Sequence, residues 1–224
     1  MADQQAVIFD LDGTLLDTLN DLATSGNEVL SNRGLPTHST DDYRTFIGNG
    51  MSNLVQRIFP EDVRPADGPE TEVALSEYRA AYDRHWRDTT CLFPGIKELL
   101  DHLTGEGIPI GVLSNKAHDF TIKCVDAFLS DWKWDIVLGS RDGIPQKPDP
   151  AAAHEAAETL GVQLGNCFFI GDSDVDMFTA VNAGMQPVGV AWGFRSVSEL
   201  TAAGAKVIID QPMDLVTLLG DSQS

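Results

Sequence analysis

The chain has 224 residues, 42% of them hydrophobic, and a formal net charge of −19 at pH 7. This composition suits one domain of ordinary size, or a core with one inserted subdomain, and disfavours intrinsic disorder. The negative charge disfavours nucleic acid and anionic membranes as partners, because both require a basic surface. We expect neither kind of partner.

The three cysteines, Cys91, Cys124 and Cys167, stand far apart and form no Cys-x-x-Cys pair. An odd number of widely spaced cysteines favours reduced thiols in a cytosol-like compartment. Residues 1–5 lack the basic start of a signal peptide, and no apolar run reaches the length of a transmembrane helix. The sequence therefore predicts a cytoplasmic protein.

Residues 5–9 are predicted to form a buried strand, because Val7-Ile8-Phe9 is an apolar, β-branched run, and two carboxylates follow it at Asp10 and Asp12. From residue 17 the apolar period changes to that of a helix, and no convincing strand appears before residue 89. We expect helices from Asp17 to about Asn32, from Asp41 with Thr40 as its N-cap, on both sides of a break at Gly48-Asn49-Gly50, and over residues 70–87.

Strands and helices then alternate to the end of the chain, which predicts a parallel sheet covered on both faces. The fold class is therefore α/β, with a Rossmann-like three-layer core from residues 1–16 and 89–224 and an all-helical insert from residues 17–88. Expected strands are 108–113, 135–138, 167–170, 187–190 and 206–209, and expected helices are 95–104, 117–129, one capped by Asp149 with Pro150 at its first position, and 174–183.

Chemically active side chains follow each of the main predicted strands. These are Asp10 and Asp12, then Ser114 and Asn115, then Lys147 in a loop, and finally Asp172, Asp174 and Asp176. Because the carboxyl ends of parallel strands meet at one edge of a sheet, that edge should collect these groups. Carboxylate oxygens suit a hard cation such as Mg²⁺, and a lysine and a hydroxyl suit a phosphoryl group.

These four groups resemble the four motifs of the haloacid dehalogenase superfamily of phosphoryl-transfer enzymes, in the family's order. The resemblance implies that Asp10 is the nucleophile and a metal ligand, and that Asp12 is the general acid/base and binds the metal through its main-chain oxygen. It implies a Mg²⁺ cofactor and the following further roles: Gly13, Ser114 and Asn115 hold the phosphoryl oxygens, Lys147 neutralises the nucleophile and phosphate, Asp172 binds the metal, and Asp176 orients Lys147 or a metal-bound water.

The helical insert has the position of this family's cap domain. Its segment Thr45-Phe46-Ile47-Gly48-Asn49-Gly50 resembles the cap of phosphoglycolate phosphatases, and so does Trp192-Gly193-Phe194-Arg195 in the core. The glycines at 48 and 50 would let a helix start approach a substrate carboxylate. The resemblance therefore implies hydrolysis of a small phosphorylated metabolite, with 2-phosphoglycolate as the best single expectation, by a monomer or homodimer.

Several alternatives stay open on the residues alone. A phosphosugar mutase of the β-phosphoglucomutase type would use the same core, and a non-catalytic binding protein could keep the fold. Asp10 and Asp12 taken alone would suit an ordinary Asx turn, and Ser114-Asn115 a helix cap. Seven of the nine arginines lie in the insert, where most should pair with neighbouring acids.

Overall fold

The computed structural model describes residues 4–66 and 68–221. The chain divides into two compact units, which we call the core unit (Met1–Leu16 with Leu92–Ser224) and the helical unit (Asp17–Cys91). At the boundary, the two-residue strands β2 (Leu16–Asp17) and β3 (Cys91–Leu92) pair with each other.

The core unit is built on a six-stranded sheet of order β5-β4-β1-β6-β7-β8, and every neighbouring pair is parallel. Its first strand, Ala6-Val7-Ile8-Phe9, is buried at every residue, because helices cover both faces of the sheet. This parallel sheet confirms the predicted α/β class. The strands are β1 (Ala6–Phe9), β4 (Ile110–Ala117), β5 (Ile136–Ser140), β6 (Cys167–Gly171), β7 (Gln186–Val190) and β8 (Val207–Ile209).

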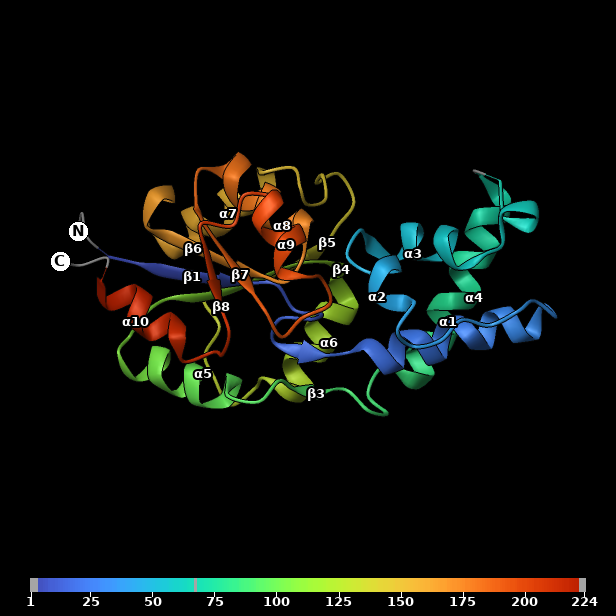
Figure 1. Cartoon of the computed structure of the whole chain (residues 1–224), viewed down its shortest axis with the longest axis horizontal. Helices are drawn as coiled ribbons and strands as arrows, with labels where there is room; N and C mark the ends of the chain where they lie inside the picture. Colours follow the sequence, from blue (N-terminus) through green and yellow to red (C-terminus); the bar gives the residue numbers. More distant parts are fainter. Residues whose placement is uncertain (1–3, 67, 222–224) are drawn as a thin grey trace. The chain divides into compact units, whose positions relative to one another are not determined.

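Helices of the core unit lie on both faces of the sheet, with α7 and α8 on one face and α5 and α10 on the other (Figure 1). Small alanines on α7 and α8, such as Ala153 and Ala180, pack in one buried cluster with Ile8 and Phe169 of the sheet. The helices are α5 (Ile96–Gly105), α6 (His118–Phe128), α7 (Ala151–Leu160), α8 (Asp174–Ala183), α9 (Val197–Ala202) and α10 (Asp214–Asp221), with a short 3₁₀ turn at Leu164–Asn166.

The helical unit contains α1 (Leu19–Asn32), α2 (Tyr43–Phe46), α3 (Gly50–Ile58), a 3₁₀ turn (Glu61–Val63) and α4 (Pro69–His85). Its longest helices, α1 and α4, pack against each other, and the Tyr78 hydroxyl of α4 donates to the Leu22 carbonyl of α1 at 3.2 Å. The buried Asp21 carboxylate accepts hydrogen bonds from the main-chain amides and hydroxyls of Thr89 and Thr90. This carboxylate ties the end of the unit back to α1.

Several element boundaries differ from the sequence expectation. Helix α2 begins at Tyr43 rather than Asp41, because Ser39 and Asp42 form a local hydrogen-bonded turn that delays it. Helix α7 begins at Ala151, after Pro150, although the Asp149 carboxylate does accept from the Ala151 amide as a cap would. The sequence did not predict the short helices α9 and α10.

Strand β4 also runs past its predicted end at residue 113 and includes Ser114, Asn115 and Lys116. Its pairing with β5 shifts register between Leu113 and Ala117, so this segment is an irregular end of the strand. In the described part of the chain, none of the helices combines the length and apolar character needed to cross a membrane.

Candidate active site

The carboxyl ends of β1 and β6 place Asp10 and Asp172 beside each other. In the parallel pairing of these strands, Phe9 lies opposite Ile170, and each acid follows its strand closely. The Asp10 amide continues the ladder by donating to the Ile170 carbonyl at 2.9 Å. Regular strand pairing therefore delivers both carboxylates to the edge where parallel sheets bind ligands.

A tight turn follows Asp10. The Leu11 carbonyl accepts from the amides of Thr14, Leu15 and Leu16, and Gly13 takes a positive φ of 86°. The Gly13 amide donates to the Leu16 carbonyl at 2.9 Å, so in this structure it serves the turn. Its predicted contact with a phosphoryl oxygen stays a prediction.

Lys147 lies at the centre of the carboxylate cluster. Its ammonium nitrogen is 2.9 Å from Asp10 Oδ1 and donates to Asp176 Oδ1 at 2.7 Å and to the Leu113 carbonyl at 3.0 Å. Burial lowers the pKa of Lys147, but the charges of Asp10 and Asp176 outweigh burial and raise this pKa overall. The two acids therefore favour the charged form of Lys147.

Asn115 fixes the main chain of Lys147. Its amide nitrogen Nδ2 donates to the Lys147 carbonyl at 3.0 Å, and its oxygen Oδ1 accepts from the Lys147 amide at 2.9 Å. The neighbouring Ser114 hydroxyl accepts from the Lys116 amide at 3.2 Å. Ser114 and Asn115, the two predicted phosphate-binding residues, are both buried at the sheet edge. In this structure, the Asn115 side chain supports the main chain of Lys147.

Asp10, Asp172 and Asp176 together form a candidate metal site. One carboxylate oxygen of each lies within 4.8 Å of the others, and all three residues are buried. Asp10 Oδ1 is buried and lies 2.9 Å from the Lys147 ammonium, but among the described residues it receives no hydrogen bond of good geometry. Three acids against the single Lys147 ammonium leave negative charge uncompensated, and an all-oxygen donor set suits a hard divalent cation. The residues therefore fit such an ion.

The pKa values of Asp10 and Asp172 are raised because these buried carboxyl groups lie close to other acids. Burial and the neighbouring Asp176 charge raise the pKa of Asp10 to about 7, against the opposing effect of Lys147. Burial, Asp176 and Asp10 likewise hold the pKa of Asp172 well above its usual range. Both shifts describe a site in which carboxylate charge is costly until a cation compensates it.

The Asp176 carboxylate is held from two sides. Its Oδ1 accepts from Lys147, and its Oδ2 accepts from the amide and hydroxyl of Ser173 in a capping box at the start of α8. The predicted metal set contains Asp12 through its main-chain oxygen, whereas the side-chain cluster contains Asp176 in its place. The helix start therefore aims Asp176 at both the lysine and the candidate ion.

Asp172 is enclosed by two glycines and two hydrogen bonds. A Cβ atom on Gly13 would lie 2.3 Å from Asp172 Oδ2, and one on Gly193 would lie 2.1 Å from Asp172 Cβ. The Phe194 amide donates to Oδ2 at 2.8 Å, and the Thr14 hydroxyl donates to Oδ1 at 3.2 Å. Loop 192–194 thus locks the orientation of one candidate metal ligand.

The family model for "Haloacid dehalogenase-like hydrolase" matches residues 7–190. The chain belongs to this family. The resemblance read from its four motifs is therefore confirmed, and so is the prediction of an enzyme.

Relatives of this hydrolase match it over nearly its whole length. A phosphoglycolate phosphatase of Pectobacterium atrosepticum is 29% identical, covering 98% of this chain and 94% of its own. One of Pseudomonas putida is 33% identical, covering 95% and 78%. The crystal structure of a proposed phosphoglycolate phosphatase from Lactobacillus delbrueckii subsp. bulgaricus has a TM-score of 0.88 and 32% identity, covering 98% and 99%. The hydrolase is phosphoglycolate phosphatase-like in sequence and fold.

Lys116 is a further residue of the site that sequence reasoning missed. Its ammonium nitrogen lies 2.9 and 3.0 Å from the two carboxylate oxygens of Asp12. The available signal was its position directly after Ser114-Asn115, in a chain with six lysines in all. Each of the two acids of the opening motif therefore has its own buried lysine, Lys147 for Asp10 and Lys116 for Asp12.

The predicted specificity segment lies in the helical unit, where Asn49 precedes α3 and Gly50 begins it. Arg57 braces this segment, donating to Asn49 Oδ1 at 2.7 Å and to the Phe46 carbonyl at 3.1 Å. Three other arginines of this unit form ion pairs with acids, in line with part of the expected charge pairing: Arg33 with Glu77, Arg44 with Asp41, and Arg84 with Glu28.

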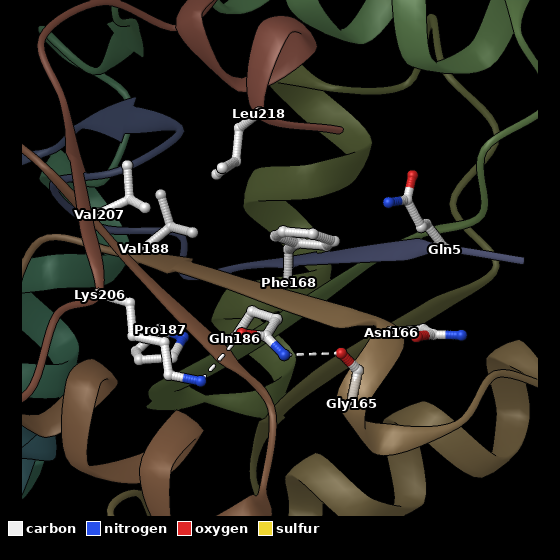
Figure 2. A pocket seen from close by; sticks show the side chains of 10 residues that line it. All are labelled: Gln5, Gly165, Asn166, Phe168, Gln186, Pro187, Val188, Lys206, Val207 and Leu218. Atoms are coloured by element: carbon white, nitrogen blue, oxygen red, sulfur yellow. Dashed lines mark hydrogen bonds between the residues drawn. The ribbon is translucent and has the colours of Figure 1, made fainter. Parts of the chain in front are cut away.

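The core unit also has a cavity of about 350 Å³ at the opposite edge of the sheet, around the amino ends of β1, β6, β7 and β8 (Figure 2). Gln186 lies on its wall, where it accepts from the Lys206 ammonium at 3.0 Å and donates to the Gly165 carbonyl at 2.8 Å. These polar groups satisfy one another across the wall, and the cavity is separate from the carboxylate cluster at the other strand ends. We therefore assign it no part in the reaction.

Proposed function

We propose that this hydrolase is a Mg²⁺-dependent phosphatase that cleaves a small phosphomonoester through an aspartyl-phosphate on Asp10. The observation that carries the proposal is the buried Asp10 carboxylate, held between Lys147 and two further acids at the sheet edge. The relatives named phosphoglycolate phosphatase make 2-phosphoglycolate the best single substrate, with glycolate and phosphate as products.

In the first step, an Asp10 oxygen attacks phosphorus and the bond from phosphorus to the ester oxygen breaks. Lys147 favours the ionised form of Asp10 and offsets charge on the phosphoryl group, while Asp12 gives its proton to the leaving alkoxide. Ser114 and Asn115 are proposed to hold phosphoryl oxygens beside the Gly13 turn. A bound Mg²⁺ would supply charge neutralisation next to Asp10, Asp172 and the Asp12 main chain.

In the second step, Asp12 takes a proton from a water molecule whose oxygen attacks phosphorus. The bond between Asp10 and phosphorus breaks, phosphate leaves, and Asp12 is again protonated for the next turnover. Asp176 is proposed to keep Lys147 in place throughout, since it accepts from the same ammonium. The reaction needs one acid that attacks phosphorus and another that transfers protons. Asp10 and Asp12 can take these different roles because each has a different lysine partner.

A test of the mechanism uses Asp10→Asn, which should bind Mg²⁺ more weakly and lose turnover while it keeps its fold. Phosphate release is measured over 2-phosphoglycolate, sugar phosphates, nucleotides and pyrophosphate, with Mg²⁺ or with EDTA. Substantial turnover by Asp10→Asn would refute the aspartyl-phosphate. Transfer of label from a bisphosphate to a sugar phosphate faster than hydrolysis would instead favour the mutase.

Specificity is proposed to reside in the helical unit at Gly48, Asn49 and Gly50. The start of a helix such as α3 attracts an anion such as the carboxylate of 2-phosphoglycolate. Arg57→Gln removes the brace on Asn49, so it should raise the KM for 2-phosphoglycolate more than that for p-nitrophenyl phosphate. Arg44→Gln, which removes an exposed arginine paired with Asp41, is the matched control and should change neither KM.

We also propose that the hydrolase is cytoplasmic and that it is a monomer or a homodimer. A reducing, cytoplasmic location suits its three cysteines, which form no disulfide. Gel filtration with light scattering would decide between the monomer and the homodimer.

A further inference from the structure

Lys116 and Asp12 form a nearly buried ion pair in the core unit. The Lys116 side chain is 3% exposed and that of Asp12 is 12% exposed. The ammonium nitrogen contacts both carboxylate oxygens at nearly equal distances, 2.9 and 3.0 Å. A cation that contacts both oxygens of a carboxylate fixes the direction in which the carboxylate points, because turning the group away would lengthen both contacts at once.

The main chain around Lys116 is itself fixed. The Lys116 amide donates to the Ser114 hydroxyl at 3.2 Å, and the Lys116 carbonyl accepts from the Thr121 hydroxyl of α6 at 3.2 Å. The residue lies in the segment of β4 where pairing with β5 shifts register. This irregular strand end, supported by α6, directs the lysine toward the turn after β1.

We propose that Lys116 is the positioning residue for Asp12: it holds the carboxylate in the orientation from which Asp12 exchanges protons with the leaving oxygen and with water. This inference rests on the proposed function. Lys116 needs no contact with the reacting atoms, because it acts through Asp12. Misplacement of a catalytic group by about 1 Å costs roughly 100-fold in rate, so the orientation of Asp12 is worth fixing.

The decisive measurement separates the two chemical steps with p-nitrophenyl phosphate. In the first step Asp10 attacks phosphorus and nitrophenolate leaves with the electron pair of the broken bond, needing no proton. In the second, Asp12, once its own proton has passed to solvent, must take a proton from the attacking water. A Lys116→Met variant should therefore release a burst of about one nitrophenolate per protein at the wild-type rate, and then turn over about 10- to 100-fold more slowly.

With 2-phosphoglycolate, whose alkoxide needs a proton, kcat of Lys116→Met should fall by the same order while KM stays within about threefold. Lys116→Arg keeps a cation and should recover part of the loss. In an Asp12→Asn background, Lys116→Met should cost little more, because the residue it positions is already gone. The double variant also carries no unpaired buried charge, so it keeps the test valid if the single variant folds poorly.

Equal losses in the burst and the slow phase, or full additivity with Asp12→Asn, would assign Lys116 a structural role and overturn the inference. Wild-type turnover in Lys116→Met would overturn it as well, leaving the proposed function intact. A wild-type protein that hydrolyses no phosphomonoester with Mg²⁺ would instead remove the proposed function and this inference together.

Discussion

The Phe194 amide donates a 2.8 Å hydrogen bond to the Asp172 carboxylate, joining the loop after β7 to a candidate metal ligand. The same loop holds the turn after β1, since the Trp192 indole donates to the Thr14 carbonyl at 3.0 Å. Gly193 lies between these two contacts, against Asp172 itself. Three consecutive residues outside the four motifs thus hold one proposed Mg²⁺ ligand and the turn beside it.

Substitution of Gly193 by alanine should weaken Mg²⁺ binding by about 10- to 100-fold, because the new Cβ would displace Asp172. The measurement is titration calorimetry of Mg²⁺ into metal-free protein, with Asp172→Asn as the reference for loss of the ligand. Gly165→Ala is the matched control, since a Cβ there meets nothing within 4 Å. Equal Mg²⁺ affinity in Gly193→Ala and wild type would contradict the role of the loop.

Neutralising Asp10 should stabilise the metal-free protein. Three buried acids face one lysine there, and Asp10→Asn removes one of the repelling charges. In EDTA at pH 8, we expect Tm to rise by roughly 2–4 °C for each kcal/mol of repulsion relieved. Saturating Mg²⁺ should reduce or reverse the difference, since the wild-type acids then bind the cation. A lower Tm for Asp10→Asn than for wild type in EDTA would show that charge repulsion among the three acids does not destabilise the metal-free protein.

In the helical unit, Asp21→Ala should lower the free energy of unfolding by about 2–4 kcal/mol, because it leaves the buried main-chain amide of Thr90 without its acceptor and removes the hydrogen bonds from Thr89. Urea denaturation measures the change. The control is Asp41→Ala, in which an exposed acid of the same unit is removed, and its effect should stay below about 0.5 kcal/mol. If both variants lowered the free energy of unfolding by similar amounts, Asp21 would have no special role in tying Thr89 and Thr90 to α1.

His85 should make the stability of the helical unit depend on pH. Hydrogen bonds with Asp88 and Glu28 raise the pKa of His85 in the folded state. The folded state then binds more protons than the unfolded one, so this contribution is complete below the unfolded pKa of about 6.5 and is lost as pH rises through the folded pKa.

The test compares urea midpoints of wild type and His85→Gln at pH 5.5 and pH 9. The wild-type advantage should be at most about 1 kcal/mol at pH 5.5, because the ion pairs lie near the surface, and should shrink at pH 9. An advantage that grows with pH would have the wrong sign for this linkage.

The elements that the sequence predicted best are those with an unambiguous local signal. Helix α8 has its predicted bounds, Asp174–Ala183, because Ser173 begins it with a capping box and Gly184 ends it in a left-handed conformation. The first strand was visible as a fully apolar run. Helix α9 has six residues, too few for the apolar period to show, although Ser196 and Glu199 form a capping box there.

The candidate site was predictable as a set of residues but not as a set of contacts. Alternation along β4 gives no sign of the shift in register that directs Lys116 toward Asp12. Sequence spacing also cannot show that Asp176 turns back into the cluster, because that depends on how the Ser173 box starts α8. Gly193 is distant in sequence from Asp172, and only the fold brings them into contact.

The irregular end of β4 has a consequence for exchanging parts between relatives. Within a few residues it provides the Leu113 carbonyl to Lys147, the Asn115 side chain to the Lys147 main chain, and Lys116 to Asp12. The positions of Lys147 beside Asp10 and of Lys116 beside Asp12 therefore both depend on the main-chain conformation of this one segment. Segment 113–117 should transfer between members of the family only as an intact cassette, and single-residue grafts within it should fail where the whole segment succeeds.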